Sequence, residues 1–102
     1  MPEKEFFIIL NEVTRIFVWF ISDKNYVEKF VVKLEYLFKN KWLEVMRYDC
    51  FHQNVHKDIF DLNGKKIRII KYPFVDEQSG LNFAIKDFKE NYKSYTWRFI
   101  NE

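Results

Sequence analysis

The stretch FVVKLEYLFKNKWLEVMRYD, residues 30–49, decides the fold. Large apolar and other side chains alternate along residues 30–38, and this period of two is typical of a half-buried β-strand. The polar residues 39–41 then reverse the chain into a second strand over residues 42–49. The stretch therefore predicts an antiparallel hairpin with one apolar face.

The pattern of this hairpin also predicts its register. A three-residue loop places Phe38 opposite Trp42, Leu34 opposite Met46 and Val32 opposite Tyr48, which gathers the large apolar side chains on one face. A shift of one residue would scatter them. On the other face, the same register places Lys33 opposite Arg47 and Val31 opposite Asp49.

Further strands and one helix are predicted on either side of this hairpin. Residues 13–21 are β-branched and aromatic, and Asn63-Gly64 is typical of a tight turn between strands at 55–61 and 65–72. That turn predicts the pairs Phe60–Ile67, Asp58–Ile69 and His56–Lys71. Residues 1–12 suit a helix start or a strand equally well. Beyond Pro73, a helix capped by Ser79 is expected to run to about Phe99.

Length and composition limit the class of protein. A chain of 102 residues is long enough for a single domain, residues 1–102. The elements predict an α+β domain, in which an antiparallel sheet of four to five strands carries the C-terminal helix on one face. The single cysteine, Cys50, excludes an internal disulfide and fits the cytoplasm. No apolar run approaches the ~20 residues of a membrane span, so no membrane association is expected.

Both histidines lie in one short segment between two predicted strand ends, which makes this segment the candidate site. His52 and His56 are accompanied there by acidic and basic side chains: Arg47, Asp49, Lys57 and Asp58. Residues 47–75 also carry an excess of three positive charges, and such a patch attracts phosphate. The alternative is that these side chains only make structural contacts and form no functional site.

The residue types favour metal-independent acid–base cleavage of RNA. Imidazole titrates near neutral pH, so His52 and His56 can act as acid and base on a ribose 2′-hydroxyl and its leaving oxygen. Asp49 would orient an imidazole. The substrate-binding set is predicted to be Arg47, Lys57, Lys71 and Asp58. No cofactor is expected.

Two other chemistries remain open for this segment. Asp49, His52, His56 and Asp58 have side chains that suit zinc, manganese or iron. The two histidines have the spacing of a zinc-protease helix, but Gln53 replaces the glutamate that such a protease needs, which excludes that activity. A nucleophilic Cys50 is disfavoured because the neighbouring Asp49 would raise the pKa of its thiol.

The segment Arg47-Tyr48-Asp49, with His52, His56 and Asp58 following it, resembles that of the TumE-like toxin components of toxin–antitoxin operons. Residues 83–92 are similar to the closing helix of those proteins, and the likeness runs from about Trp42 to Arg98. Phe51 and Gln53 depart from the commoner pattern. The resemblance implies a toxin that acts on RNA and pairs with a cognate antitoxin-like protein.

A different class of function is also compatible with the sequence. The chain contains 21 aromatic residues, which is more than one helix can cover, and an open sheet has exposed edges. These features predict a non-catalytic interaction module that forms a homo-oligomer or pairs with a partner protein.

Overall fold

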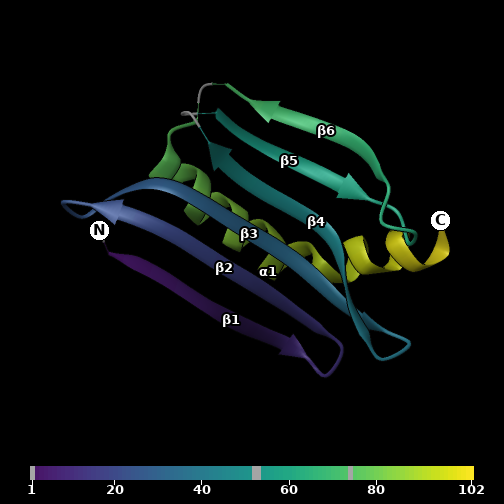
Figure 1. Ribbon diagram of the computed structural model, residues 1–102. Coiled ribbons are helices and arrows are strands. Elements are labelled where there is room, and N and C mark those ends of the chain that lie inside the picture. The colour runs from purple at the N-terminus through teal and green to yellow at the C-terminus, as the bar shows by residue number, and fades with distance from the viewer. Residues whose placement is uncertain (1, 52–53, 74) are drawn as a thin grey trace.

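The computed structural model describes residues 2–51, 54–73 and 75–102, and it shows one antiparallel sheet with one helix (Figure 1). The predicted α+β arrangement is confirmed, but the sheet has six strands instead of four to five, in the order of the chain. The additional strand is formed by residues 3–11, which pair with the next strand of the chain. The elements are β1 (Glu3–Asn11), β2 (Thr14–Asp23), β3 (Tyr26–Phe38), β4 (Lys41–Phe51), β5 (Asn54–Phe60), β6 (Lys66–Tyr72) and α1 (Glu77–Asn101).

The central hairpin β3–β4 confirms most of the predicted register. Val32 pairs with Tyr48, and Lys33 pairs with Arg47. The predicted pairing of Phe38 with Trp42 is wrong, because the turn has two residues, Lys39 and Asn40, both with positive φ. A register shift within β4 compensates for the shorter turn.

This shift moves Trp42 to the face opposite the one predicted for it. Trp42 pairs with Leu37, and the guanidinium of Arg15 lies 4.0 Å from the centre of its ring. The apolar alternation alone did not indicate the bulge, because bulges depend on local backbone hydrogen bonding.

The β5–β6 hairpin pairs Asp58 with Ile69 and His56 with Lys71, as predicted. The predicted Phe60–Ile67 pair is wrong, since Phe60 pairs with Lys66. The loop is longer than two residues because the Asp61 carboxylate accepts hydrogen bonds from the backbone amides of Asn63 and Lys65.

Helix α1 crosses one face of the sheet, over β3, β4 and β5 and the margin of β2 (Figure 1). Its N-cap is Asp76, not Ser79 as predicted, because the Asp76 carboxylate accepts the Ser79 amide at 2.8 Å. Gly80 allows a close approach, since a Cβ there would lie 2.9 Å from Val55 Cγ2 and 3.1 Å from the Phe30 ring.

The apolar core lies between α1 and the sheet, and it includes Val32, Leu34, Tyr48 and Phe88. Tyr48 therefore points into the core, as the register predicted. In the part of the chain that the structure describes, no helix lies on the opposite face of the sheet, which we call the open face. Within the described residues, no helix has the length and apolar character needed to cross a bilayer.

Candidate functional site

Four side chains of the predicted site meet on the open face, where β4 and β5 lie side by side. The antiparallel register places Asp49 opposite His56 and Arg47 opposite Asp58. Side chains of directly opposed residues share a face and lie close together. The sequence pattern of two neighbouring strands thus produces one polar cluster, which we define as Arg47, Asp49, His56 and Asp58.

His56 lies between the two carboxylates of this cluster. Its Nε2 is 2.7 Å from Asp49 Oδ1 and 3.9 Å from Asp58 Oδ2. Asp49 and Asp58 are deeply buried, at 6% and 1% exposure, although none of the described elements covers the open face. Their neighbours on the same face provide this burial, so the cluster is a packed unit with one half-exposed imidazole.

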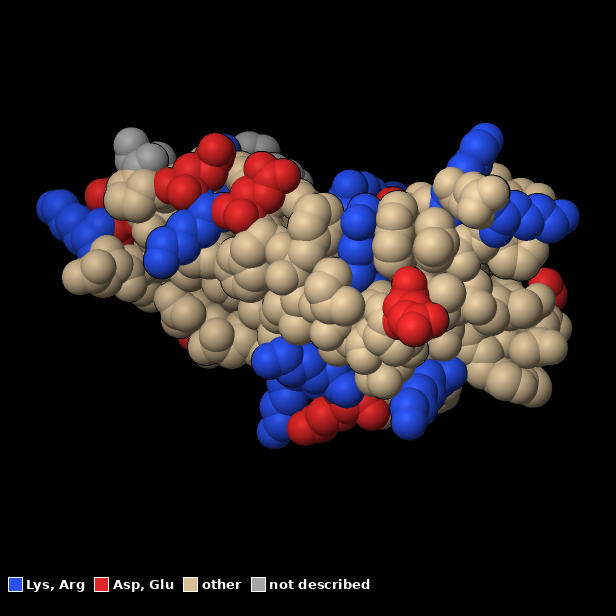
Figure 2. All heavy atoms as spheres, turned by 90° about the horizontal axis from the view of Figure 1, so that it is seen from below, with Lys and Arg blue, Asp and Glu red and all other residues tan. Residues whose placement is uncertain are grey.

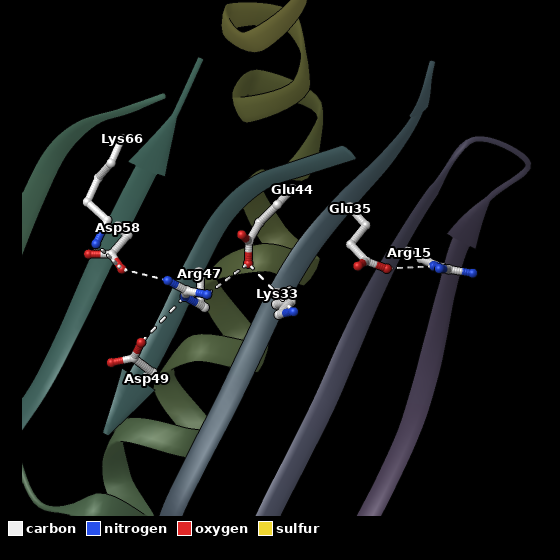
Figure 3. A network of polar contacts seen from close by, with 8 residues as sticks. All are labelled: Arg15, Lys33, Glu35, Glu44, Arg47, Asp49, Asp58 and Lys66. Carbon is white, nitrogen blue, oxygen red and sulfur yellow. Dashed lines mark hydrogen bonds and ion pairs between the residues drawn. The ribbon is translucent and has the colours of Figure 1, made fainter. Parts of the chain in front are cut away.

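Arg47 lies between three carboxylates of the open face, those of Glu44, Asp49 and Asp58 (Figure 3). Its guanidinium lies 3.4 Å from Asp49, 3.3 Å from Asp58 and 3.7 Å from Glu44. Asp58 has a second cation, Lys66, at 3.2 Å. Partial burial makes such charge-assisted contacts stronger than they are on a fully solvated surface.

Burial changes the proton affinity of two of these acids. Desolvation raises the pKa of Asp49 above its ordinary value, although the His56 ring and the Arg47 guanidinium oppose this shift. Desolvation likewise raises the pKa of Glu44, against the lowering effect of Arg47 and Lys33. Asp49 is therefore easier to protonate than a solvated aspartate, as a group that exchanges protons should be.

A hollow of about 330 Å³ adjoins the cluster on the open face. Its lining combines aromatic rings with cations: Phe17, Trp19, Val31, Lys33, Arg47 and Asp49. Lys33 Nζ lies 5.5 Å from the centre of the Phe17 ring. The hollow thus offers flat apolar surfaces and positive charge next to the imidazole.

A second polar cluster lies on the other side of the sheet, beneath α1. Lys57 Nζ lies 3.1 Å from Asp87 Oδ2, and Asp87 accepts hydrogen bonds of 2.6 Å from the hydroxyls of Tyr48 and Tyr95. Burial alone would raise the pKa of Asp87, but these bonds, a bond from Asn91 and the Lys57 charge outweigh it and lower that pKa. The cluster attaches the helix to β4 and β5.

The chain matches the model of a family described as a domain of unknown function, DUF7718, over residues 1–102. It belongs to the DUF7718 family. No curated protein and no solved structure matches it.

The DUF7718 structure brings together Arg47, Asp49, His56 and Asp58, and it places Lys71 across the strand pair from His56. Lys57 does not join them, because it points beneath the helix and is only 6% exposed. Adjacent residues of a strand point to opposite faces, so Lys57 and His56 cannot share a face. His52 lies outside the described residues.

Three charged residues that contact the predicted site residues were not predicted to do so: Glu44, Lys66 and Asp87. Glu44 reaches Arg47 only through the bulge in β4, and Lys66 reaches Asp58 only through the register shift in β6. Neither irregularity has a clear sequence signal. Asp87 had no clear signal either, because the helical period places it at the margin between the apolar and the charged face of the predicted helix.

Proposed function

We propose that the open face binds RNA and that Asp49 and His56 take part in cleaving it. The observation that supports this proposal is the 2.7 Å contact between His56 Nε2 and Asp49 Oδ1 at the border of the aromatic and cationic hollow. Single-stranded RNA is bound by stacking of bases on aromatic rings and by cations that follow the phosphates. Phe17, Trp19 and Lys33 supply these groups.

The proposed reaction is an internal transfer at phosphorus. An imidazole removes the proton of a ribose 2′-hydroxyl, the 2′-oxygen bonds to phosphorus, and the bond to the 5′-oxygen breaks. The leaving 5′-oxygen takes a proton from a second group, for which His52 stays the prediction. Asp49 orients the His56 ring, and Arg47 neutralises charge that develops on the phosphate.

The proposal includes the role that the resemblance to TumE-like proteins implies, that of a toxin with an antitoxin partner. A TumE-like toxin would act on RNA in the cytoplasm and would be neutralised by an antitoxin-like protein. Such a partner would act by covering the hollow or the adjoining imidazole.

An RNA cleavage assay tests the catalytic part. The purified protein is incubated with single-stranded RNA in EDTA and, separately, in manganese, beside a His56→Ala variant. We expect this variant to cleave about 10²- to 10⁴-fold more slowly, which is the usual contribution of a general acid or base. Equal cleavage by both proteins, or no cleavage in either medium, contradicts the catalytic part.

RNA binding is measured separately by fluorescence anisotropy with a labelled oligonucleotide. Trp19→Leu removes a ring from the hollow, and we expect it to weaken binding by about 5- to 150-fold, the value of one base stack. The matched control is Trp97→Leu, because Trp97 is an exposed tryptophan on the helix. Equal affinity of the two variants would place RNA elsewhere.

The edge strand β1 favours a second candidate function, self-association. Phe6, Phe7 and Ile9 are exposed on β1, and α1 packs mainly on β3, β4 and β5, away from this strand. Figure 2, which views the molecule from the β1 side, shows uncharged side chains over much of this side, with charged groups around and among them. A long apolar edge strand is a template for pairing with another strand, so we propose that two copies join through β1.

Light scattering measures this association directly. Ile9→Lys places a charge on the edge, where Ile9 is 69% exposed, and we expect it to convert a dimer into a monomer. The control is Ile69→Lys on the other edge strand, at 52% exposure, which should leave the dimer unchanged. A wild-type protein that is monomeric at all concentrations contradicts the second candidate.

A further inference from the structure

We propose that Asp49, His56 and Asp58 bind a divalent transition-metal ion such as manganese or zinc. This inference concerns the site of the proposed function and names a cofactor for it. One imidazole nitrogen and two carboxylate oxygens form a donor set that suits these ions. Binding of the ion requires neither RNA nor cleavage, so it can be measured by itself.

The spacing of the donors fits a single ion. One ligand atom from each residue lies within 4.8 Å of the other two, and His56 Nε2 is 2.7 Å from Asp49 Oδ1. Neighbouring donors around a metal at ~2.1 Å are ~3.0–3.4 Å apart in octahedral or tetrahedral geometry. Shifts of less than an ångström in the side chains would therefore complete the coordination.

The orientation of the Asp49 carboxylate is an independent observation. Its Oδ1 is buried, and among the described residues it accepts no hydrogen bond, although the imidazole nitrogen lies only 2.7 Å away. Oδ1 and Nε2 therefore face each other, and an unprotonated Nε2 can donate a lone pair to an ion, as the carboxylate oxygen can. Two ligands that converge on one ion lie this close together.

The second carboxylate shows the same pattern. Asp58 Oδ1 is buried and also lacks a hydrogen-bond partner within the described part of the chain. The other oxygen of each carboxylate, Oδ2, faces the Arg47 guanidinium, at 3.4 Å for Asp49 and 3.3 Å for Asp58. A buried oxygen without a partner is costly, and a bound cation would remove that cost.

Arg47 would act as the residue that orients both ligands from outside the coordination sphere. It holds Oδ2 of each aspartate, which leaves Asp49 Oδ1 directed toward His56 and Asp58 Oδ1 without a hydrogen bond among the described residues. The hollow beside Asp49 leaves room for water or a phosphate oxygen to complete the coordination. The ion would thus attract the phosphate of a substrate to the cluster.

Lys66 competes with the proposed ion. Its Nζ lies 3.2 Å from Asp58 Oδ2, and its side chain is 40% exposed, so it can move into solvent. With Asp49 and Asp58 charged, Arg47 and Lys66 balance the site, and the ion adds positive charge to it. Removal of the Lys66 charge should therefore strengthen metal binding. If the cluster has only a structural role, removal of this charge should not produce metal binding.

Isothermal titration of metal-free protein with manganese chloride or zinc chloride, in the absence of RNA, tests the proposal. We expect one ion per chain, a loss of at least 10-fold in affinity for Asp49→Asn and His56→Ala, and no change for the control Glu90→Gln on the helix. Lys66→Gln should bind about 2- to 5-fold more tightly, the value of one removed surface charge. Circular dichroism confirms that each variant is folded.

Two results would overturn the metal site: no binding of either ion, or equal affinity of wild type, Asp49→Asn and His56→Ala. The proposed function has its own readout. Cleavage of RNA in EDTA by a protein that binds no metal removes the metal site and keeps the function. Specific metal binding by a protein that neither cleaves nor binds RNA keeps the metal site and removes the proposed function.

Discussion

An Asp87→Asn variant is expected to lose about 3–5 kcal/mol of unfolding free energy, the cost of removing one partner of a buried ion pair. Lys57 is only 6% exposed and has its ammonium 3.1 Å from Asp87. The asparagine keeps the size of the side chain but leaves this ammonium buried without a countercharge. Urea unfolding measures the loss, which is a large part of the ~5–15 kcal/mol typical of a small domain.

A double variant separates the charge from the shape. Lys57→Met with Asp87→Leu removes both charges, and we expect it to recover part of the stability lost in Asp87→Asn, since the hydroxyls of Tyr48 and Tyr95 lose their acceptor. The control Glu90→Gln changes a carboxylate on the exposed side of the same helix and should alter stability by less than about 0.5 kcal/mol. A loss below about 1 kcal/mol for Asp87→Asn would contradict the buried pair.

The pH dependence of this effect has a definite sign. The folded pKa of Asp87 is lowered, so its stabilisation is complete above the ordinary carboxyl pKa and disappears as pH falls through the folded value. The stability difference between wild type and Asp87→Asn should therefore be largest at neutral pH and shrink in acid.

Arg47→Leu is expected to cost about 3 kcal/mol, at the lower end of the range for a broken buried pair because Arg47 is half-exposed. Its guanidinium contacts Glu44, Asp49 and Asp58, all of which lose a countercharge in the variant. Urea unfolding again measures the change.

The matched control for this variant is Arg15→Leu, on the same face of the sheet. Arg15 is also half-exposed but has one carboxylate partner, Glu35, at 2.7 Å. A single exposed or half-exposed pair contributes about 1 kcal/mol or less. If the two arginine variants lost the same stability, Arg47 would not act as the link between three carboxylates.

Much of the sheet was predictable because its information is local. The alternation in residues 30–38 fixes which side chains enter the core, and Val32–Tyr48 and Lys33–Arg47 follow from it. The Asp58–Ile69 and His56–Lys71 pairs were also predicted correctly, because a register shift next to the loop compensates for a loop longer than the two residues expected. The meeting of Arg47, Asp49, His56 and Asp58 has the same local basis, because these residues occupy opposed positions of two predicted strands.

The errors arise where backbone geometry overrides the side-chain pattern. Trp42 changes face because a two-residue turn is followed by a bulge, and both depend on hydrogen bonds that the alternation does not encode. Lys57 was assigned to the site by its position beside His56, whereas strand geometry directs it beneath the helix. A partner for it, Asp87, lies 30 residues away.

The sequence by itself determined an antiparallel sheet with a C-terminal helix, an apolar face, and a cluster of ionisable groups on the other face. Hydrophobic periodicity and turn chemistry suffice for this, since both act over a few residues. Only the tertiary structure decided the sixth strand, the burial of Asp49 and Asp58, and the partners of Lys57, Glu44 and Lys66. Those features depend on strand bulges and on contacts between distant segments, which arise when the whole sheet and the helix pack together.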